Sequence, residues 1–298
     1  MSADRSVRTK VDGRELTVSN LDKVLYPSTG FTKGQVIDYY ARVADVMLPH
    51  LRDRPLTMKR YPNGVDSKYF FEKHIPRHAP SWVNRLSVPS TSDGPAVEFP
   101  VIGDRPSLAW AANLAAIEYH VPLWHAGRRR VLPAPPDHMV FDLDPGEGTS
   151  IVECCAVAGY VGEVLDDGRR GCWPKTSGSK GLQLYLPLAG RPTWDKVRDR
   201  AREVAVRLER EHPELVVSNM RKSLRQGKVL IDWSQNHPAK TTVAVYSLRG
   251  RPEPTVSTPV TWGEVDGCAR SGRPADLSFT ADVVLERIEA HGDLFAEV

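Results

Sequence analysis

The sequence has few cysteines, and none of them shows the paired spacing of a zinc ribbon or a zinc finger. The four are Cys154, Cys155, Cys172 and Cys268, so we expect reduced, structural thiols and no zinc. No apolar run approaches the length of a membrane span, and the polar first residues lack the apolar core of a signal peptide. These absences predict a cytoplasmic protein without a membrane partner.

Strong charge of one sign is also absent. The 298 residues include 40 Lys and Arg against 37 Asp and Glu, which gives a formal net charge of +3. Any surface that binds nucleic acid therefore has to be local. No internal repeat or long low-complexity linker divides the chain, and its length suits one large domain or two tightly packed halves.

Capping signals and apolar spacing locate the helices. Thr32 with Gln35, and Ser150 with Glu153, have the spacing of a capping box at a helix start. Apolar residues three and four apart then continue the helical pattern. Together these signals predict helices over residues 33–48, 151–165, 194–212 and 281–292.

Strands are predicted between these helices, at "GLQLYLPL" (181–188) and "KVLIDWSQN" (228–236). Interleaved helices and strands favour a mixed α/β (α+β) fold over a helical bundle or a β-sandwich. Asp232 ends the second of these strands, and His120 in "IEYHVPLW" enters another apolar strand. Taken singly, the two are typical of a solvated strand end and of a core histidine.

The segment "MVFDLDPGEG", residues 139–148, places two aspartates one residue apart at the end of an apolar run. Side chains at i and i+2 of a strand share a face, so Asp142 and Asp144 point the same way. Two ionised carboxylates side by side repel unless a cation or a shared proton lies between them, and a divalent metal is the simplest partner. Asp before Pro-Gly is also ordinary turn chemistry, so both interpretations stay open here.

Other segments suggest binding of phosphate and of bases. The loop "TSGSKG" (176–181) offers backbone amides, hydroxyls and Lys180 to an anion, although it departs from the Walker pattern and suits a plain turn equally well. Lys33 begins a helix, where a bound anion would offset the unfavourable position of a cation. Phe70 and Phe71 lie between lysines, as expected either for a base-stacking surface or for core residues.

Taken in order, these motifs resemble a known family, the polymerase domain of bacterial DNA ligase D in the archaeo-eukaryotic primase superfamily. The resemblance spans residues 16–295 and rests on "NLDKVLYPSTGFTK", "RYPNGVDSKYFFEK", "HVPLW", "VFDLDPGEG", "TSGSKGL", "KSLRQGKVLIDWSQN" and "KTTVAVYSLRGR". It implies a primase-like α/β (α+β) catalytic core with central β-sheets flanked by helices. We expect a polar N-terminal extension over residues 1–15 and one compact catalytic domain over residues 16–298.

The resemblance also implies an activity. We expect a template-dependent DNA polymerase or primase, a nucleotidyltransferase that uses two Mn²⁺ or Mg²⁺ ions and takes nucleoside triphosphates, preferably ribonucleotides. Its expected role is to fill short gaps or to extend broken ends in non-homologous end joining. The implied partners are DNA with a gap, an overhang or a 5′-phosphate end, a separate DNA ligase and Ku, at the bacterial nucleoid.

Roles follow residue by residue from the same resemblance. The implied metal ligands are Asp142, Asp144 and Asp232, and His120 is the further catalytic residue. The implied nucleotide-binding residues are Lys59, Ser177, Ser179, Lys180, Gln183, Arg225, Gln235 and Arg249. Lys23 and Lys33 match positions that hold a 5′ phosphate, and Phe70 and Phe71 match residues that stack on template bases.

Gln183 departs from the family pattern, in which this position is usually histidine. An amide donates a hydrogen bond but cannot carry the charge of a protonated imidazole. The sequence therefore predicts weaker triphosphate binding, and it predicts that Gln183→His lowers the apparent nucleotide KM.

Three alternative functions stay open. One is synthesis of short primers by the same site, and another is a catalytically weak module that only binds 5′-phosphate DNA ends. The third is a sugar-nucleotide transferase, which the Asp-x-Asp pair alone would support. Primer extension separates a polymerase from the end-binding module, and hydrolysis of sugar nucleotides tests the third.

Overall fold

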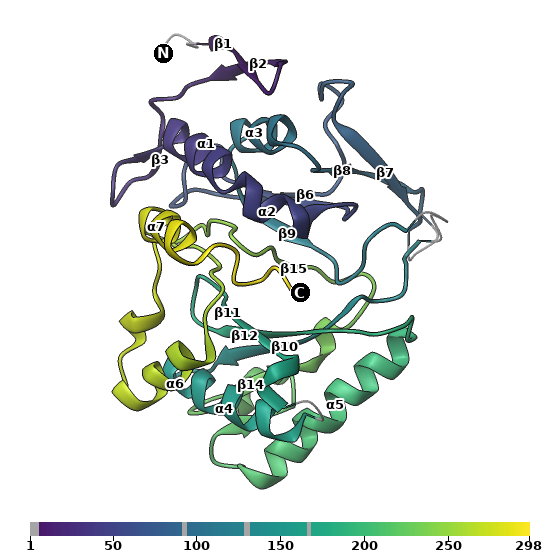
Figure 1. Ribbon diagram of the computed structural model, residues 1–298, viewed down its shortest axis with the longest axis vertical. Helices are drawn as coiled ribbons and strands as arrows, with labels where there is room; N and C mark the ends of the chain where they lie inside the picture. Colours follow the sequence, from purple (N-terminus) through teal and green to yellow (C-terminus); the bar gives the residue numbers. More distant parts are fainter. Residues whose placement is uncertain (1–5, 91–93, 128–131, 166–167) are drawn as a thin grey trace.

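Two β-sheets face each other between layers of helices in the computed structural model, which describes residues 6–90, 94–127, 132–165 and 168–298 (Figure 1). This arrangement is the mixed α/β fold with sheets flanked by helices that the sequence predicts. Within the described residues, none of the helices combines the length and the apolar composition that crossing a membrane requires.

A four-stranded antiparallel sheet forms one half of the molecule, in the order β15-β9-β5-β6. Its strands are β5 (Thr57–Arg60), β6 (Phe70–Glu72), β9 (Ala116–Val121) and β15 (Thr242–Val243). Its outer face is covered by α1 (Lys33–Arg42), α2 (Ala44–Leu51) and α3 (Arg105–Asn113) (Figure 1). The sequence predicts the helix that begins at Lys33, but it does not predict α3.

The single helix predicted over residues 33–48 is two helices. The capping box of Thr32 and Gln35 is present at its start. At Val43, however, ψ is −1°, well away from the value of about −42° of a regular helix, and the chain changes direction there. The second helix, α2, then continues through Pro49 to Leu51.

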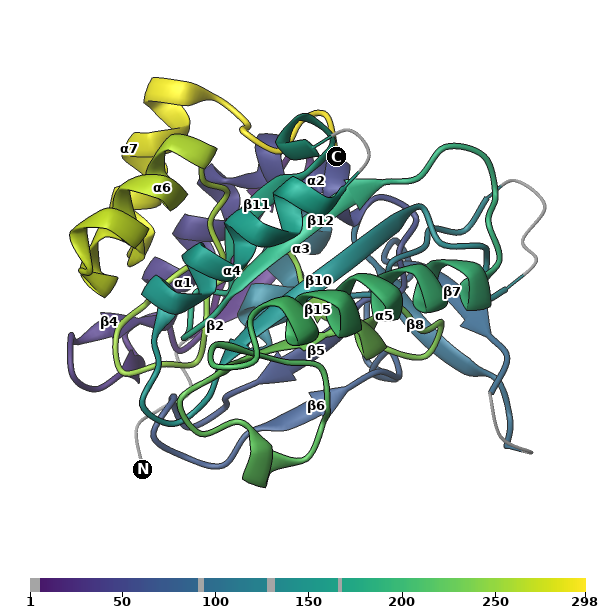
Figure 2. The ribbon, with the colours of Figure 1, turned by 90° about the horizontal axis from the view of Figure 1, so that it is seen from below.

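A five-stranded sheet forms the other half, in the order β11-β12-β10-β14-β13, with only the last pair parallel. Its strands are β10 (His138–Pro145), β11 (Trp173–Thr176), β12 (Leu182–Pro187), β13 (Val216–Val217) and β14 (Val229–Asp232). The predicted strand at residues 228–236 thus ends at Asp232. Helices α4 (Ile151–Val164) and α5 (Trp194–Glu211) lie against the outer face (Figure 2).

Smaller elements complete the fold. Three two-stranded ribbons are formed by β1 (Ser6–Val11) with β2 (Arg14–Ser19), β3 (Val24–Tyr26) with β4 (Phe31–Thr32), and β7 (Asn84–Val88) with β8 (Val97–Val101). The C-terminal helices are α6 (Trp262–Ser271) and α7 (Ala281–His291), and the latter matches the predicted closing helix. All four cysteines are buried and free.

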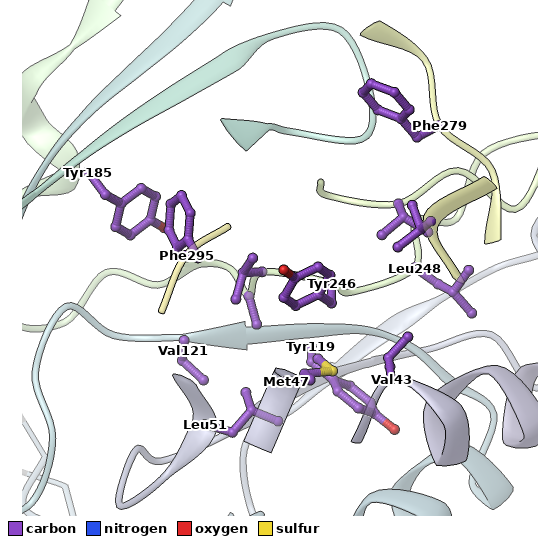
Figure 3. Packing of buried hydrophobic residues seen from close by; sticks show 14 of the residues in the cluster. Val43, Met47, Leu51, Tyr119, Val121, Tyr185, Tyr246, Leu248, Phe279 and Phe295 are labelled. Atoms are coloured by element: carbon purple, nitrogen blue, oxygen red, sulfur yellow. The ribbon is translucent and has the colours of Figure 1, made fainter. Parts of the chain in front are cut away.

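Aromatic side chains fill part of the space between the two sheets. Tyr185 of β12 and Phe295 near the C-terminus have ring centroids 5.5 Å apart, and they lie beside Tyr246 and Val121 (Figure 3). Phe295 is 2% exposed and Tyr246 is 2% exposed. Burial of such large apolar surfaces stabilises the packing of one sheet on the other.

Successive side chains of strand β10 point alternately into the apolar core and to the opposite, polar face. Phe141 and Leu143 have no exposed surface and lie in the apolar core. Asp142 and Asp144 point to the opposite face. That face looks toward β15, because Gln183, which bonds Asp142, is itself bonded to Lys175, and Lys175 reaches the carbonyl of Val243.

Asn236 extends the hydrogen bonding of β10 beyond the end of β14. Its Oδ1 accepts from the Val140 N–H at 2.9 Å, and its Nδ2 donates to the Val140 carbonyl at 2.8 Å and to the Trp233 carbonyl at 2.9 Å. Its side chain, which has no exposed surface, therefore does what a neighbouring strand would do. This bond pair also fixes the turn that follows Asp232.

We expect Asn236→Ala to lower the free energy of unfolding by about 3 kcal/mol, because it leaves two buried backbone groups of Val140 without partners. Urea unfolding measures this loss. The matched control is Asn219→Ala, which changes an exposed asparagine and should cost about 0.5 kcal/mol or less. Equal effects of the two substitutions would contradict the role of Asn236.

Candidate active site

Three carboxylates meet where β10 and β14 pair. Asp142 and Asp232 are directly opposite each other in the register of the two strands, and Asp144 lies two residues further along β10. Asp142 is buried, whereas Asp144 and Asp232 are half-buried. The pairing of the strands therefore gathers the three aspartates that the sequence singled out.

The electrostatics of this group are unfavourable for negative charge. Burial raises the pKa of Asp142 to about 7, and the neighbouring carboxylates of Asp144 and Asp232 add to the shift. Burial and the charge of Asp232 also raise the pKa of Asp144, which Arg225 partly opposes. A cation placed between the carboxylates would remove this penalty.

The donor set fits a hard divalent cation, since Mg²⁺ and Mn²⁺ prefer carboxylate oxygens. Within the part of the chain that the structure describes, no three His, Cys, Asp or Glu side chains are arranged to hold a metal ion. Asp232 also accepts hydrogen bonds, at Oδ1 from the backbone N–H of Ser234 at 2.9 Å and at Oδ2 from Gln235 at 3.3 Å. Each carboxylate oxygen has a further lone pair, so these hydrogen bonds leave Asp232 able to ligate an ion.

The loop of residues 176–181 connects β11 to β12 beside the end of β10. Gly181 packs so closely there that a Cβ would lie 2.2 Å from the Leu143 carbonyl oxygen, and at Gly178 φ is +65°. Ser177 Oγ accepts from the backbone N–H groups of Ser179 and Gly181. The two glycines are thus required by close approach and by backbone conformation, and the loop lies next to Asp144.

Some of the predicted nucleotide-binding residues lie in this loop or contact it, and the others lie beside the aspartates. Ser179 and Lys180 are exposed at the loop tip, and the backbone carbonyl of Ser177 accepts from Arg249 at 2.6 Å. Gln235 bonds Asp232, and Arg225 is close enough to Asp144 to lower its pKa. Gln183 is buried beside Asp142, to whose Oδ1 it donates at 3.1 Å.

Glu118 organises a second group of predicted residues, and sequence reasoning missed it. Its Oε1 lies 3.0 Å from Lys59 Nζ and accepts from Tyr61 at 2.7 Å, while its Oε2 lies 3.0 Å from His120 Nε2 and 3.3 Å from Arg249 Nε. Burial alone would raise the pKa of Glu118, but the hydrogen bond with His120 and the charges around it hold that pKa far below its usual value.

The signal for Glu118 was available in the sequence. Glu118 and His120 are two residues apart in "IEYHVPLW" and so share a face of β9. What the sequence could not indicate is that Lys59, from β5, and Arg249, from a distant segment, meet at the same carboxylate. Glu118 is therefore a positioning residue that holds three side chains with predicted roles.

The two lysines predicted to bind a 5′ phosphate lie close together but differ in exposure. The backbone N–H of Lys33 donates to the Lys23 carbonyl at 2.8 Å. Lys23 is exposed, and its Nζ donates to Asn63 at 3.1 Å. Lys33 is only 6% exposed, and its Nζ donates to the Ser19 carbonyl at 2.7 Å. That bond engages one of the three donors of the Lys33 ammonium.

Phe70 and Phe71 are exposed, by 44% and 55%, so the core interpretation of this pair is wrong. They lie on β6, and the neighbouring Tyr69 is also exposed. The Phe71 ring lies 5.8 Å from the ring of His120, and Lys59 Nζ lies 4.1 Å from the centre of the Tyr69 ring. An exposed aromatic surface thus continues into the Glu118 group.

Comparison with known proteins matches these features to one family. A family model described as LigD, primase-polymerase domain, matches residues 32–295. The multifunctional non-homologous end joining DNA repair protein LigD of Mycobacterium tuberculosis is 47% identical over 285 residues, which cover 94% of this chain and 36% of that protein. The bifunctional LigD of Bacillus subtilis is 34% identical, over 93% of this chain and 43% of that protein.

A solved structure agrees in fold. The polymerase domain from Mycobacterium tuberculosis ligase D, in complex with DNA, has a TM-score of 0.87 and 47% identity, and the match covers 95% of this chain and 97% of that one. The resemblance inferred from the motifs is confirmed. The chain spans about 36% of the mycobacterial relatives and 43% of the Bacillus one.

The raised pKa of Asp142 predicts a pH dependence of stability. Between its ordinary value of 3.8 and about 7, the folded state keeps a proton that the unfolded chain has lost. The contribution of this group is therefore fully present below pH 4 and is lost as the pH rises toward 7. We expect Asp142→Asn, in EDTA, to raise the free energy of unfolding at pH 7.5 by on the order of 4 kcal/mol, since one pKa unit corresponds to about 1.4 kcal/mol.

Urea unfolding at pH 5 and pH 7.5 measures this effect, and the gain from the substitution should be smaller at pH 5. Asp38→Asn, at an exposed position of α1, is the control. Its effect on the free energy of unfolding should not increase between pH 5 and pH 7.5. A gain at position 142 that is the same at both pH values would contradict the assignment of the shift to this carboxylate.

Proposed function

The chain belongs to the LigD primase-polymerase family, a family of DNA-directed nucleotidyltransferases, and from that premise we propose that it fills short gaps and extends broken DNA ends on a template. The observation that carries the proposal is the group of Asp142, Asp144 and Asp232 beside the loop of residues 176–181. A nucleotidyl transfer needs this combination, because a 3′ hydroxyl attacks the α-phosphate of a charged triphosphate while pyrophosphate leaves.

The three aspartates are the proposed ligands of two Mn²⁺ or Mg²⁺ ions. When bound, such ions lower the pKa of an attacking 3′ hydroxyl and stabilise the leaving pyrophosphate. The raised pKa of Asp142 supports the proposal, because the carboxylates stay ionised at neutral pH most easily beside a cation.

The remaining residues bind and orient the nucleotide in this proposal. Ser179 and Lys180, exposed at the tip of the loop, contact the triphosphate. Arg249 offers a planar guanidinium that suits phosphate oxygens, and it is held by Glu118 and by the carbonyl of Ser177. His120 and Lys59 share the same carboxylate and line the approach from the exposed aromatic residues.

DNA is the proposed partner. Phe70 and Phe71 offer exposed rings on which template bases can stack. Lys23 and Lys33 are the proposed contacts of a downstream 5′ phosphate; the Lys23 amine donates to Asn63 and the Lys33 amine to the Ser19 carbonyl. We further propose a preference for ribonucleotides, and action with Ku and a DNA ligase in end joining.

Extension of a primer across a short gap tests the proposed activity. With Mn²⁺, a downstream 5′ phosphate and either ribo- or deoxynucleotides, we expect extension by the wild type, faster with ribonucleotides. The Asp142→Ala, Asp144→Ala double variant should lose at least about 1000-fold in rate, because the transition-state charge loses its counter-ions. Asp38→Asn should extend normally, and a wild type that binds the DNA without extending it would favour an end-binding module.

The 5′-phosphate contact predicts a selective effect of Lys23. We expect Lys23→Ala to weaken binding of a gapped duplex that carries a 5′ phosphate by about three- to tenfold, and to leave binding of the 5′-hydroxyl duplex unchanged, because one exposed charge pair is lost. Fluorescence anisotropy with the two duplexes measures the ratio. Lys10→Ala, at an exposed position of β1, is the control, and an equal loss for both duplexes would contradict the assignment.

A further inference from the structure

Lys175 of β11 has no exposed surface, although it carries an amine. Its Nζ lies 2.7 Å from Gln183 Oε1, 2.6 Å from Ser257 Oγ and 3.1 Å from the Val243 carbonyl oxygen. Ser257 Oγ itself donates to the carbonyl of Thr176 at 2.9 Å, so toward Lys175 it can only accept. The Val243 carbonyl can only accept as well, and the structure turns the oxygen of the Gln183 amide toward the amine, so all three contacts are donations from Lys175.

Three donations require three N–H groups, which an ammonium has and a neutral amine lacks. Burial and the charge of Arg249 lower the pKa of Lys175 well below its usual value, and the charge of Asp142 opposes this. The number of acceptors decides the matter in favour of the ammonium, because each of them is held at hydrogen-bond distance. A positive charge thus lies behind Gln183, on the side away from Asp142.

The structure has the Gln183 amide oxygen toward Lys175 and the amide nitrogen toward Asp142. An ammonium can only donate, so it stabilises this orientation of the amide over the flipped one. Gln183 is 4% exposed, so water offers its amide little alternative.

We propose that Lys175 is a positioning residue: it pins the Gln183 amide so that its N–H holds one oxygen of Asp142 and leaves the other free to bind a metal ion. The proposal rests on the proposed function, since it takes Asp142 as a metal ligand. Groups that orient a ligand from behind typically change metal affinity by tenfold or more when removed.

The sign of the effect separates this role from two others. If Lys175 acted only as a nearby charge, removing it would reduce repulsion and tighten the binding of a cation. If it served only to fill the interior, removing its charge would change stability and leave metal affinity as it is. Pinning of Gln183 instead predicts weaker metal binding, because the freed amide can turn its oxygen toward Asp142.

Equilibrium binding of Mn²⁺ to the whole chain, without nucleotide or DNA, is the test. Lys175→Met keeps the length of the side chain and removes its donors, and we expect the Mn²⁺ Kd to rise about tenfold. Gln183→Met removes the amide itself and should raise the Kd by a similar factor, so it decides the matter if Lys175→Met fails to fold. Tyr185→Phe, which loses one buried hydrogen bond to Thr242, is the packing control and should keep the wild-type Kd.

The outcomes are distinct. A Kd that is unchanged or lower in Lys175→Met, or unchanged in Gln183→Met, would overturn the positioning role while leaving the proposed function intact. Failure of the wild type to bind Mn²⁺ would overturn both. Failure of Asp142→Asn to weaken Mn²⁺ binding would contradict Asp142 as the ligand, and with it the proposal.

Discussion

Mutual repulsion of three carboxylates is the constraint on which the rest of this structure depends. Asp142 and Asp232 face each other across the β10–β14 pair, with Asp144 two residues away. Burial and their common charge raise the pKa of Asp142 to about 7. Three features hold these carboxylates together despite their repulsion. They are the antiparallel pairing of the strands, the hydrogen bonds from the Asn236 side chain to Val140 of β10, and the hydrogen bond from the Ser234 N–H to Asp232.

Glu118 shows the opposite solution for a buried carboxylate in the same molecule. Lys59, His120 and Arg249 surround it, and their hydrogen bonding and charge outweigh the effect of burial on its pKa. Glu118 is thus satisfied by the protein itself and serves to fix its neighbours. The aspartates on β10 keep an electrostatic penalty that a bound cation would remove. In this respect a binding site differs from a structural ion pair, whose charges the protein itself neutralises.

The interior between the two sheets connects these two regions. Lys175 reaches from β11 to the carbonyl of Val243 on β15, and its ammonium orients Gln183 toward Asp142. A solved structure from the LigD primase-polymerase family shares this fold at 47% identity. The Gln183 side chain of β12 is thus accompanied by the amine of Lys175 from the neighbouring strand β11.

The sequence by itself determined what local periodicity and capping control: the helix starts at Thr32 and Ser150, the shared face of Asp142 and Asp144, and the motifs that identify the family. It could not determine the break at Val43, because that depends on a single backbone angle. Only the tertiary structure decided that Glu118 gathers side chains from several segments, that Lys33 is bound by Ser19, and that Lys175 lies behind Gln183. Such contacts join residues far apart in the chain, and their energies depend on burial and distance, which no spacing along a sequence specifies.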